Sequence, residues 1–228
     1  MGKLFDFLSG IQILQEVESP INGKITVVKD LAWGTHFQVD GVTQSGGILK
    51  KVWETTLKKV AKDQRLQTNN CLILGLGGGS VAQLIRKYWL KAKITGVDID
   101  PMMVGLGEKY LGLSRVQVQV QVQDAYDFVS TSSLSAGKAG SAVKPFNGYD
   151  LICIDLYLGS EFPKKFESEV FLRLVLKLLT SSGVAIFNHL YGYNHRTSAI
   201  KFGKKLERVF KKVNPYYPEA NVMFICSK

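Results

Sequence analysis

Two hydrophobic patterns alternate along the chain from residue 70 onward. Short apolar runs such as "CLILGLG", "KITGVDID" and "YDLICIDLY" alternate with segments such as "VAQLIRKYWLK", in which apolar residues recur every three or four positions. Short apolar runs predict buried strands, and the longer spacing predicts helices. Strands that alternate with helices indicate a parallel sheet covered by helices on both faces, so we expect an α/β fold.

The two ends of the chain show different patterns. Residues 20–45 consist of short strand-like runs with a hairpin signal at Asp40-Gly41, which predicts a small antiparallel β unit. The opening "MGKLFDFLSGIQILQEVESP" lacks the long apolar core of a secretory signal and is interpreted as an N-terminal helix or arm. The final "VNPYYPE" and "NVMFICSK" predict a terminal antiparallel hairpin.

Three further segments have distinctive patterns. "VQVQVQVQDA" alternates apolar residues with glutamine, which is typical of a half-exposed strand near a sheet edge. Residues 130–148 are small, polar and glycine-rich, which predicts a surface insertion. "ESEVFLRLVLKLLT" predicts a helix that ends at Ser182-Gly183.

Composition narrows the class of protein. The 228 residues, 46% of them hydrophobic, are enough for a sizeable core, and no apolar run approaches the roughly 20 residues of a membrane span. The cysteines, Cys71, Cys153 and Cys226, lie in strand-like runs without metal-site or disulfide spacing. We therefore expect buried thiols, no metal site, no membrane partner and a cytoplasmic location.

A formal net charge of +10 favours an anionic partner. Part of the excess lies in "SAIKFGKKLERVFKK", where apolar residues at helical spacing leave a lysine-rich opposite face. No aromatic residues interleave with these lysines to stack on bases. A solvated outer face is therefore favoured over a nucleic-acid surface.

Chemistry is expected where parallel strands end, because ligands of such sheets bind beyond those ends. "GLGGGS", Gly75 to Ser80, follows the first strand and lets a ligand approach the backbone closely. Its third-glycine position holds Ser80, and no Gly-Lys-Ser/Thr follows, which excludes a phosphate P-loop.

Acidic residues follow the next strands. Asp98, about twenty residues beyond the glycines, is placed to accept hydrogen bonds from two ribose hydroxyls, whereas Asp100 before Pro101 suits a helix cap. Asp124 suits either an exocyclic amine of adenine or a helix cap. Asp155 ends the fourth strand beside the expected reaction centre.

Three weaker candidates lie beyond Asp155. Tyr157 and Glu161 follow it on a loop, and His189 follows the fifth strand and could equally be structural. Taken together, the strand ends describe a nucleoside-containing cofactor that lies across the sheet.

These residues closely resemble a known family. "LILGLGGGSVAQLI", "ITGVDIDPMMVGLGEKYLGL", "VQDAYDFV" and "YDLICIDLY" resemble the spermidine synthase-like branch of the S-adenosylmethionine-dependent (class I) methyltransferase superfamily, and "FQVDGVTQSGG" resembles its N-terminal β unit. The resemblance covers residues 20–228. It implies a Rossmann-like methyltransferase fold with a mostly parallel seven-stranded sheet and a terminal antiparallel hairpin. It divides the chain into residues 1–48, an arm and small β unit, and residues 49–228, the cofactor domain.

The resemblance also implies roles for individual residues. Asp155 would take the catalytic aspartate's place, with Tyr157 beside it as a second catalytic candidate. Cofactor-binding roles would fall to Gln44, Gly75, Gly77, Gly79, Asp98, Ile99, Asp124, Ala125 and Asp155. Among these, the glycines would line the amino-acid or aminopropyl portion, and Gln44 would reach the nucleoside from the β unit. The resemblance also implies a homodimer, with the N-terminal unit as the element that would mediate it.

The chain departs from spermidine synthases at three places. Gly78 stands where their "GGGDGG" loop has Asp, "DLYLG" replaces "DSSDP", and "WETT" places Trp53 where they have Tyr. A diamine carries two positive charges and needs carboxylates to hold it, and each charge-assisted hydrogen bond contributes about 1.5–3 kcal/mol.

The leading hypothesis is therefore an enzyme that binds S-adenosylmethionine, or its decarboxylated form, and transfers an alkyl group, with methyl favoured, to an unknown acceptor. The first alternative is aminopropyl transfer to a polyamine. The second is a non-catalytic protein that binds a nucleoside or nucleic acid. A nicotinamide-dependent enzyme is the weakest, because the third glycine is missing and the terminal hairpin is present.

Overall fold

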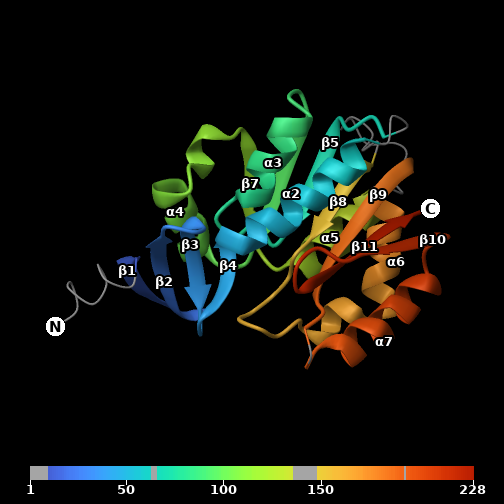
Figure 1. The fold of residues 1–228 in the computed structure, drawn as a ribbon. Coiled ribbons are helices and arrows are strands. Elements are labelled where there is room, and N and C mark those ends of the chain that lie inside the picture. The colour runs from blue at the N-terminus through green and yellow to red at the C-terminus, as the bar shows by residue number, and fades with distance from the viewer. Residues whose placement is uncertain (1–9, 63–65, 136–147, 193) are drawn as a thin grey trace.

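The chain folds into two sheets that lie side by side. The computed structural model describes residues 10–62, 66–135, 148–192 and 194–228. Within them, a four-stranded antiparallel sheet precedes a seven-stranded sheet. Figure 1 shows the small sheet (blue) at one side of the molecule and helix α7 (Arg196–Glu207) at the other. The predicted α/β fold with a small N-terminal β unit is confirmed.

The small sheet has the strand order β1 to β4. Its strands are β1 (Ile11–Ser19), β2 (Gly23–Asp30), β3 (Gly34–Val39) and β4 (Val42–Gly46). Asp40 and Gly41 form the predicted hairpin turn, both with positive φ. The expected N-terminal helix or arm is wrong for residues 11–19, which pair with β2 along their length and pack Leu14 and Val17 against the small sheet's core. Residues 1–9 lie outside the described residues.

The large sheet has the order β10-β11-β9-β8-β5-β6-β7. Its strands are β5 (Asn70–Leu74), β6 (Lys93–Asp98), β7 (Val118–Val122), β8 (Tyr149–Ile154), β9 (Leu179–Leu190), β10 (Lys212–Tyr216) and β11 (Asn221–Ser227). Strands β5 to β9 run parallel, and β11 pairs antiparallel with both β9 and β10. The predicted parallel sheet, the terminal hairpin and the edge position of the alternating strand β7 are confirmed.

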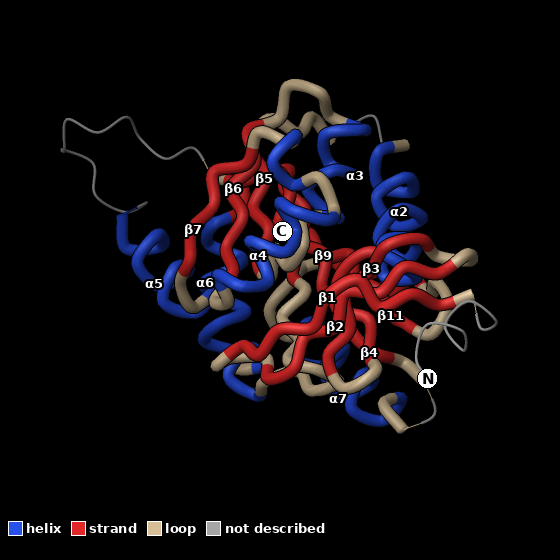
Figure 2. The backbone as a smooth tube through the Cα atoms, turned by 90° about the vertical axis from the view of Figure 1, so that its left-hand side faces the viewer, coloured by secondary structure: helices blue, strands red, loops and turns tan. Residues whose placement is uncertain are grey.

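Helices cover both faces of the large sheet. Helices α2 (Gly47–Ala61) and α3 (Ser80–Tyr88) cover one face, and α5 (Ala125–Ser135), α6 (Glu169–Leu178) and α7 cover the other. Figure 2 shows α2 and α3 on the opposite side of the parallel strands from α5 and α6. Alternation along β5 serves both layers, because Leu72 and Leu74 face one core while Cys71 and Ile73 face the other.

Helix α4 (Pro101–Tyr110) joins the two sheets. Its Met103 and Leu106 pack against the buried face of the small sheet, and its Val104 belongs to the large sheet's core. The described residues also form two short 3-10 helices, Leu113–Arg115 and Lys164–Glu167. The small sheet is thereby fixed at the carboxyl ends of the parallel strands, where chemistry was expected.

Three expectations about local structure need correction. Helix α6 ends at Leu178, and Ser182 and Gly183 lie inside β9, where the absence of a side chain lets Gly183 approach the Tyr149 carbonyl of β8. Helix α7 ends at Glu207, so Lys212 already belongs to β10. The insertion expected at residues 130–148 begins as the end of α5, and residues 136–147 lie outside the described residues.

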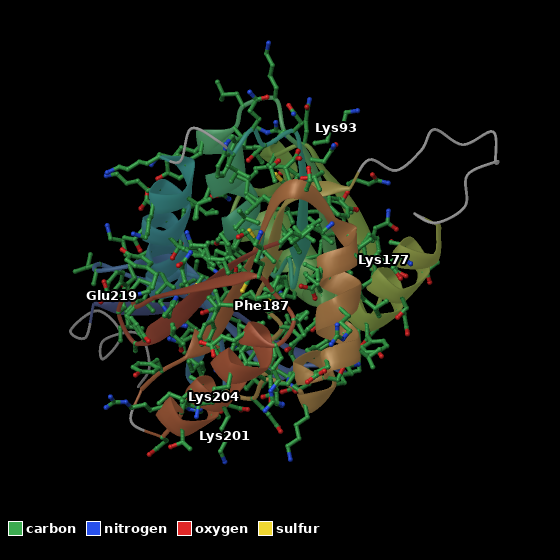
Figure 3. The ribbon with its side chains drawn as sticks, turned by 90° about the vertical axis from the view of Figure 1, so that its right-hand side faces the viewer. Lys93, Lys177, Phe187, Lys201, Lys204 and Glu219 are labelled. Atoms are coloured by element: carbon green, nitrogen blue, oxygen red, sulfur yellow. The ribbon has the colours of Figure 1, made fainter. Side chains whose placement is uncertain are left out.

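The basic face of α7 points outward. Lys201 and Lys204 are exposed at the outer side of the helix, as Figure 3 shows, whereas Ala199, Phe202 and Leu206 are buried. Among the described residues, no helix is both long enough and apolar enough to cross a membrane.

Candidate active site

A cavity of about 520 Å³ lies at the carboxyl ends of β5, β6, β7 and β8. The first turns of α2 and strand β4 of the small sheet complete its wall, together with the ends of β9 and β11. This volume lies within the range of cofactor and substrate pockets, roughly 300–1,000 Å³. The residues predicted from successive strand ends, Gly75, Asp98, Asp124 and Asp155, all line it.

The glycine loop brings backbone to the cavity wall. Gly75 has φ of 85°, and a Cβ there would lie 2.0 Å from the Asp155 carbonyl oxygen. Gly77, also with positive φ, lines the cavity, and a Cβ there would be in ordinary van der Waals contact with Ser45, whose Oγ would lie at 3.5 Å. Gly79 does not line the cavity; it is the left-handed residue before α3, packed against Leu113.

Gly78 and Ser80 hold the small sheet against the loop. The Gly78 N–H donates to Ser45 Oγ at 3.0 Å, and the Gly46 N–H donates to Ser80 Oγ at 3.0 Å. A Cβ on Gly78 would come within 2.7 Å of Phe37. Both departures from the glycine motif therefore have a packing reason: Gly78 leaves room for the small sheet, and Ser80 binds it.

Asp98 is held by backbone groups at the end of β6. Its Oδ2 accepts the Gly77 N–H at 2.6 Å and its Oδ1 accepts the Asp100 N–H at 2.9 Å, while Ile99 lines the cavity beside it. Burial raises the pKa of Asp98, and these two N–H donors act against that rise. Each carboxylate oxygen keeps a lone pair for a further donor.

Asp100 has the capping role predicted for it. Its Oδ1 accepts the Met102 N–H at 2.9 Å, and Pro101 begins α4. Its Oδ2 accepts hydrogen bonds from Ser19 and Asn22 of the small sheet. The pair Asp98 and Asp100 therefore divides into a cavity residue and a structural residue, as the sequence predicted.

Asp124 lies at the end of β7 and serves two structural partners. Its Oδ1 accepts the Tyr126 N–H at 2.7 Å at the start of α5, and its Oδ2 pairs with Lys165. Ala125, buried next to it, also lines the cavity. The capping alternative for Asp124 is confirmed, and its predicted contact with adenine stays a prediction.

Asp155 is held by side chains that come from distant segments. Trp53 Nε1 of α2 donates to its Oδ2 at 2.7 Å, and Asn188 Nδ2 of β9 donates to its Oδ1 at 2.7 Å. Asn221 Nδ2 in turn donates to Asn188 Oδ1 at 2.8 Å. Burial raises the pKa of Asp155, and the Asn188 and Trp53 donors oppose that rise.

The three weaker candidates differ in position. Tyr157 lines the cavity, but its hydroxyl accepts the Leu190 N–H at 2.7 Å, and burial raises its pKa. Glu161 is exposed and lies outside the cavity wall. His189 is buried between the rings of Phe162 and Phe202, on the opposite face of β9 from Asn188. This position supports the structural role for His189.

Gln44 closes the cavity. It lines the wall from β4, and its Nε2 donates to the Gly159 carbonyl oxygen at 2.8 Å, in the loop that follows Asp155. This bond joins the small sheet to the loop across the cavity. The contact of Gln44 with a nucleoside stays a prediction.

Comparison with known proteins agrees with this geometry. The spermine/spermidine synthase domain family matches residues 51–222, which is most of the chain. The chain belongs to this family. Members of the family are S-adenosylmethionine-dependent transferases that use S-adenosylmethionine or its decarboxylated form as co-substrate.

Relatives of two activities match the chain. A polyamine aminopropyltransferase of Vibrio vulnificus is 29% identical over 58% of the chain and 43% of its own length. The human eEF1A lysine and N-terminal methyltransferase is 31% identical over 51% of the chain and 17% of its own length. The chain thus spans less than half of these relatives. The spermidine synthase of Thermotoga maritima shares the fold, with a TM-score of 0.75, 17% identity, and coverage of 95% of this chain and 72% of that one.

The residues present fit an adenosyl sulfonium co-substrate. Gly77 offers bare backbone at the cavity wall, and Asp98 keeps free lone pairs at the end of the next strand. Asp155 lies one strand away from the glycine loop on the other side, so a ligand along the loop has Asp98 at one end and Asp155 at the other.

Sequence reasoning missed the residues that hold Asp155. Asn188 lies next to His189, which was the sequence-based candidate because histidine is the more frequent catalytic residue. Strand alternation gave a signal, since Phe187 and His189 share one face of β9 and Asn188 faces the other. Lys165 and Asn221 had no comparable signal.

Proposed function

We propose that this protein transfers the aminopropyl group of decarboxylated S-adenosylmethionine to an amine nitrogen bound at Asp155. The observation that carries this proposal is the charge of the cavity wall. Its charged groups among the described residues are three carboxylates, Asp98, Asp124 and Asp155, and one cation, Lys165, which already pairs with Asp124.

The decarboxylated donor matches these charges. It carries a sulfonium and an ammonium, whereas S-adenosylmethionine also carries a carboxylate that needs donors or a cation. No described lysine or arginine of the cavity wall is left for that carboxylate. The Vibrio aminopropyltransferase also covers more of the chain than the human methyltransferase does, which favours the same group.

The chain's own residues would position the acceptor and accept its proton. A bound sulfonium donor supplies an electrophilic carbon. When the amine nitrogen forms its bond to that carbon, the carbon–sulfur bond breaks and its electron pair goes to sulfur. Asp155 would accept the proton that the nitrogen releases. It lines the cavity, and burial raises its pKa, which makes its carboxylate a better base. Trp53 and Asn188 fix the plane of its carboxylate, so most of the rate gain would come from positioning.

Methyl transfer from S-adenosylmethionine is the second candidate, and one observation favours it. The N-terminus of α3 lies at the glycine loop, and the first N–H groups of a helix, which lack intrahelical partners, could bind the co-substrate's carboxylate without a cation. The human methyltransferase relative is consistent with this alternative.

Calorimetry followed by product analysis tests the proposal. We expect decarboxylated S-adenosylmethionine to bind at least about 10-fold more tightly than S-adenosylmethionine, and turnover to release methylthioadenosine. Release of S-adenosylhomocysteine would establish the second candidate instead. Absence of binding by both donors and by methylthioadenosine would overturn both.

Asp155→Asn separates chemistry from binding. Without a carboxylate to accept the proton, the transfer rate should fall about 100-fold or more, while the dissociation constant of methylthioadenosine, which carries neither positive charge of the donor, stays nearly unchanged. Glu161→Gln is the matched control, because Glu161 is exposed and lies outside the cavity wall. Full transfer activity in Asp155→Asn would remove Asp155 from the mechanism.

A further inference from the structure

The acceptor end of the cavity, the part around Asp155, is formed largely by apolar side chains. It lies where α2, β9 and the start of β11 meet, and Trp53 and Asn188 mark its floor. These three regions contribute the apolar residues Ile48, Leu49, Val52, Leu190 and Ala220 to the cavity wall, beside the amides Asn188 and Asn221. Such a wall favours a hydrocarbon part of a substrate over a charged one.

Carboxylates are scarce at this end. Of the three described carboxylates of the cavity wall, Asp98 is held at the glycine loop and Asp124 pairs with Lys165 at the far edge of the sheet. Asp155 alone remains, and each of its oxygens already accepts one hydrogen bond. It is thus the one described carboxylate of the cavity wall that is left for an ammonium or amine group at this end.

We infer that the acceptor carries one amine group on an apolar body, and that a diamine of the same length is rejected. This inference rests on the proposed transferase function, for either transferred group. A second ammonium would be placed among Ile48, Leu49 and Val52 without a partner, which costs more than leaving it in water. The apolar wall thus acts as the specificity-determining element of the site.

Two acceptors of equal length test the inference. Enzyme saturated with methylthioadenosine is titrated with n-hexylamine and with 1,6-diaminohexane in a calorimeter. We expect hexylamine to bind at least about 10-fold more tightly, in line with the loss of one charge-assisted bond. Equal or tighter binding of the diamine would overturn the inference, and so would failure of both amines to bind.

The same titrations separate the inference from the proposed function. Tight binding of methylthioadenosine together with preference for the diamine removes the inference and leaves the transferase. If neither methylthioadenosine nor S-adenosylhomocysteine binds, the proposed function fails and the inference falls with it.

Leu49→Glu tests the element that sets specificity. A carboxylate in the first turn of α2 should supply the missing partner and shift the ratio of the two affinities about 10-fold towards the diamine. Lys58→Gln on the exposed side of the same helix lowers the net charge equally and should leave the ratio unchanged. An equal shift in both variants would mean that total charge, and not the apolar wall, sets the preference.

Discussion

The two ends of the cavity hold their carboxylates in different ways. At the donor end, the part around the glycine loop, Asp98 accepts hydrogen bonds from two backbone N–H groups. One belongs to Gly77 in the glycine loop and the other to Asp100, two residues further along the chain. At the acceptor end, Asp155 accepts two side-chain donors, from Trp53 in α2 and Asn188 in β9. Backbone donors therefore hold the carboxylate of the donor end, and side-chain donors hold that of the acceptor end.

This difference indicates which part of the site can change. Backbone donors at a strand end persist whenever the fold forms, so the donor end is fixed together with the sheet. Side-chain donors can be replaced singly without changing the sheet. We therefore expect members of this fold to share the binding of the donor's adenosyl part and to differ in the acceptor and in the group transferred, which is consistent with the two activities among the relatives.

The donor end should respond to mutation in affinity, in contrast to Asp155→Asn. In Asp98→Asn, the amide cannot accept from both the Gly77 and Asp100 N–H groups and still receive ribose hydroxyls through charged oxygens. The dissociation constant of methylthioadenosine should rise about 100-fold, equivalent to about 2.7 kcal/mol, while the rate at saturating donor changes much less. Calorimetry and saturation kinetics measure both quantities.

Asp127→Asn is the control for that variant, because Asp127 is exposed on α5 and changes the charge equally. If Asp98→Asn lowered the rate at saturating donor and left the affinity for methylthioadenosine intact, the assignment of binding to the donor end and of chemistry to the acceptor end would be wrong.

Gly78 stands where the loop of spermidine synthases has Asp. Substituting it tests whether an acidic side chain at this position would reach the acceptor end of the cavity. In Gly78→Asp, the new side chain would overlap Leu111, Phe37 and Ser45 instead of entering the cavity. We expect the free energy of unfolding to fall by at least about 2 kcal/mol, with no gain in diamine binding. Denaturant unfolding and the hexanediamine titration give the two readings.

Gly105→Asp is the matched control for Gly78→Asp. Gly105 lies in α4 with open space where a side chain would go, so the same substitution there should leave stability nearly unchanged. A stable Gly78→Asp protein that binds diamines would show that the loop, and not the apolar wall, excludes them.

The same contrast explains how much the sequence could predict. Gly75, Asp98 and Asp124 were found because hydrophobic runs end at them, and strand ends of a parallel sheet meet at one edge. The partners of Asp155 lie 102 and 33 residues away, and only packing brings them together. The strand at Ile11–Ser19 was missed for a similar reason, since its half-exposed pattern gains meaning only beside β2.

Strand β9, which supports the acceptor end, also carries a histidine that should make stability depend weakly on pH. β9 presents Asn188 to the cavity and His189 to the aromatic cluster of Phe162 and Phe202, where His189 Nε2 has no hydrogen-bond partner among the described residues. Burial lowers the pKa of His189, so the unfolded chain takes up a proton that the folded protein excludes. Stability should therefore fall as the pH drops through about 6.5, the ordinary value for histidine.

His189→Phe should remove that dependence, because phenylalanine suits the cluster and does not titrate. We expect its free energy of unfolding to exceed that of the parent by about 1 kcal/mol near pH 5.5, with a smaller difference at pH 7.5. Transfer activity at pH 7.5 should be retained, since the ring lies on the opposite face of β9 from Asn188. Unfolding curves at both pH values measure the change. Loss of activity with stability intact would instead place His189 in the acceptor end and extend the side-chain-built part of the site through the sheet.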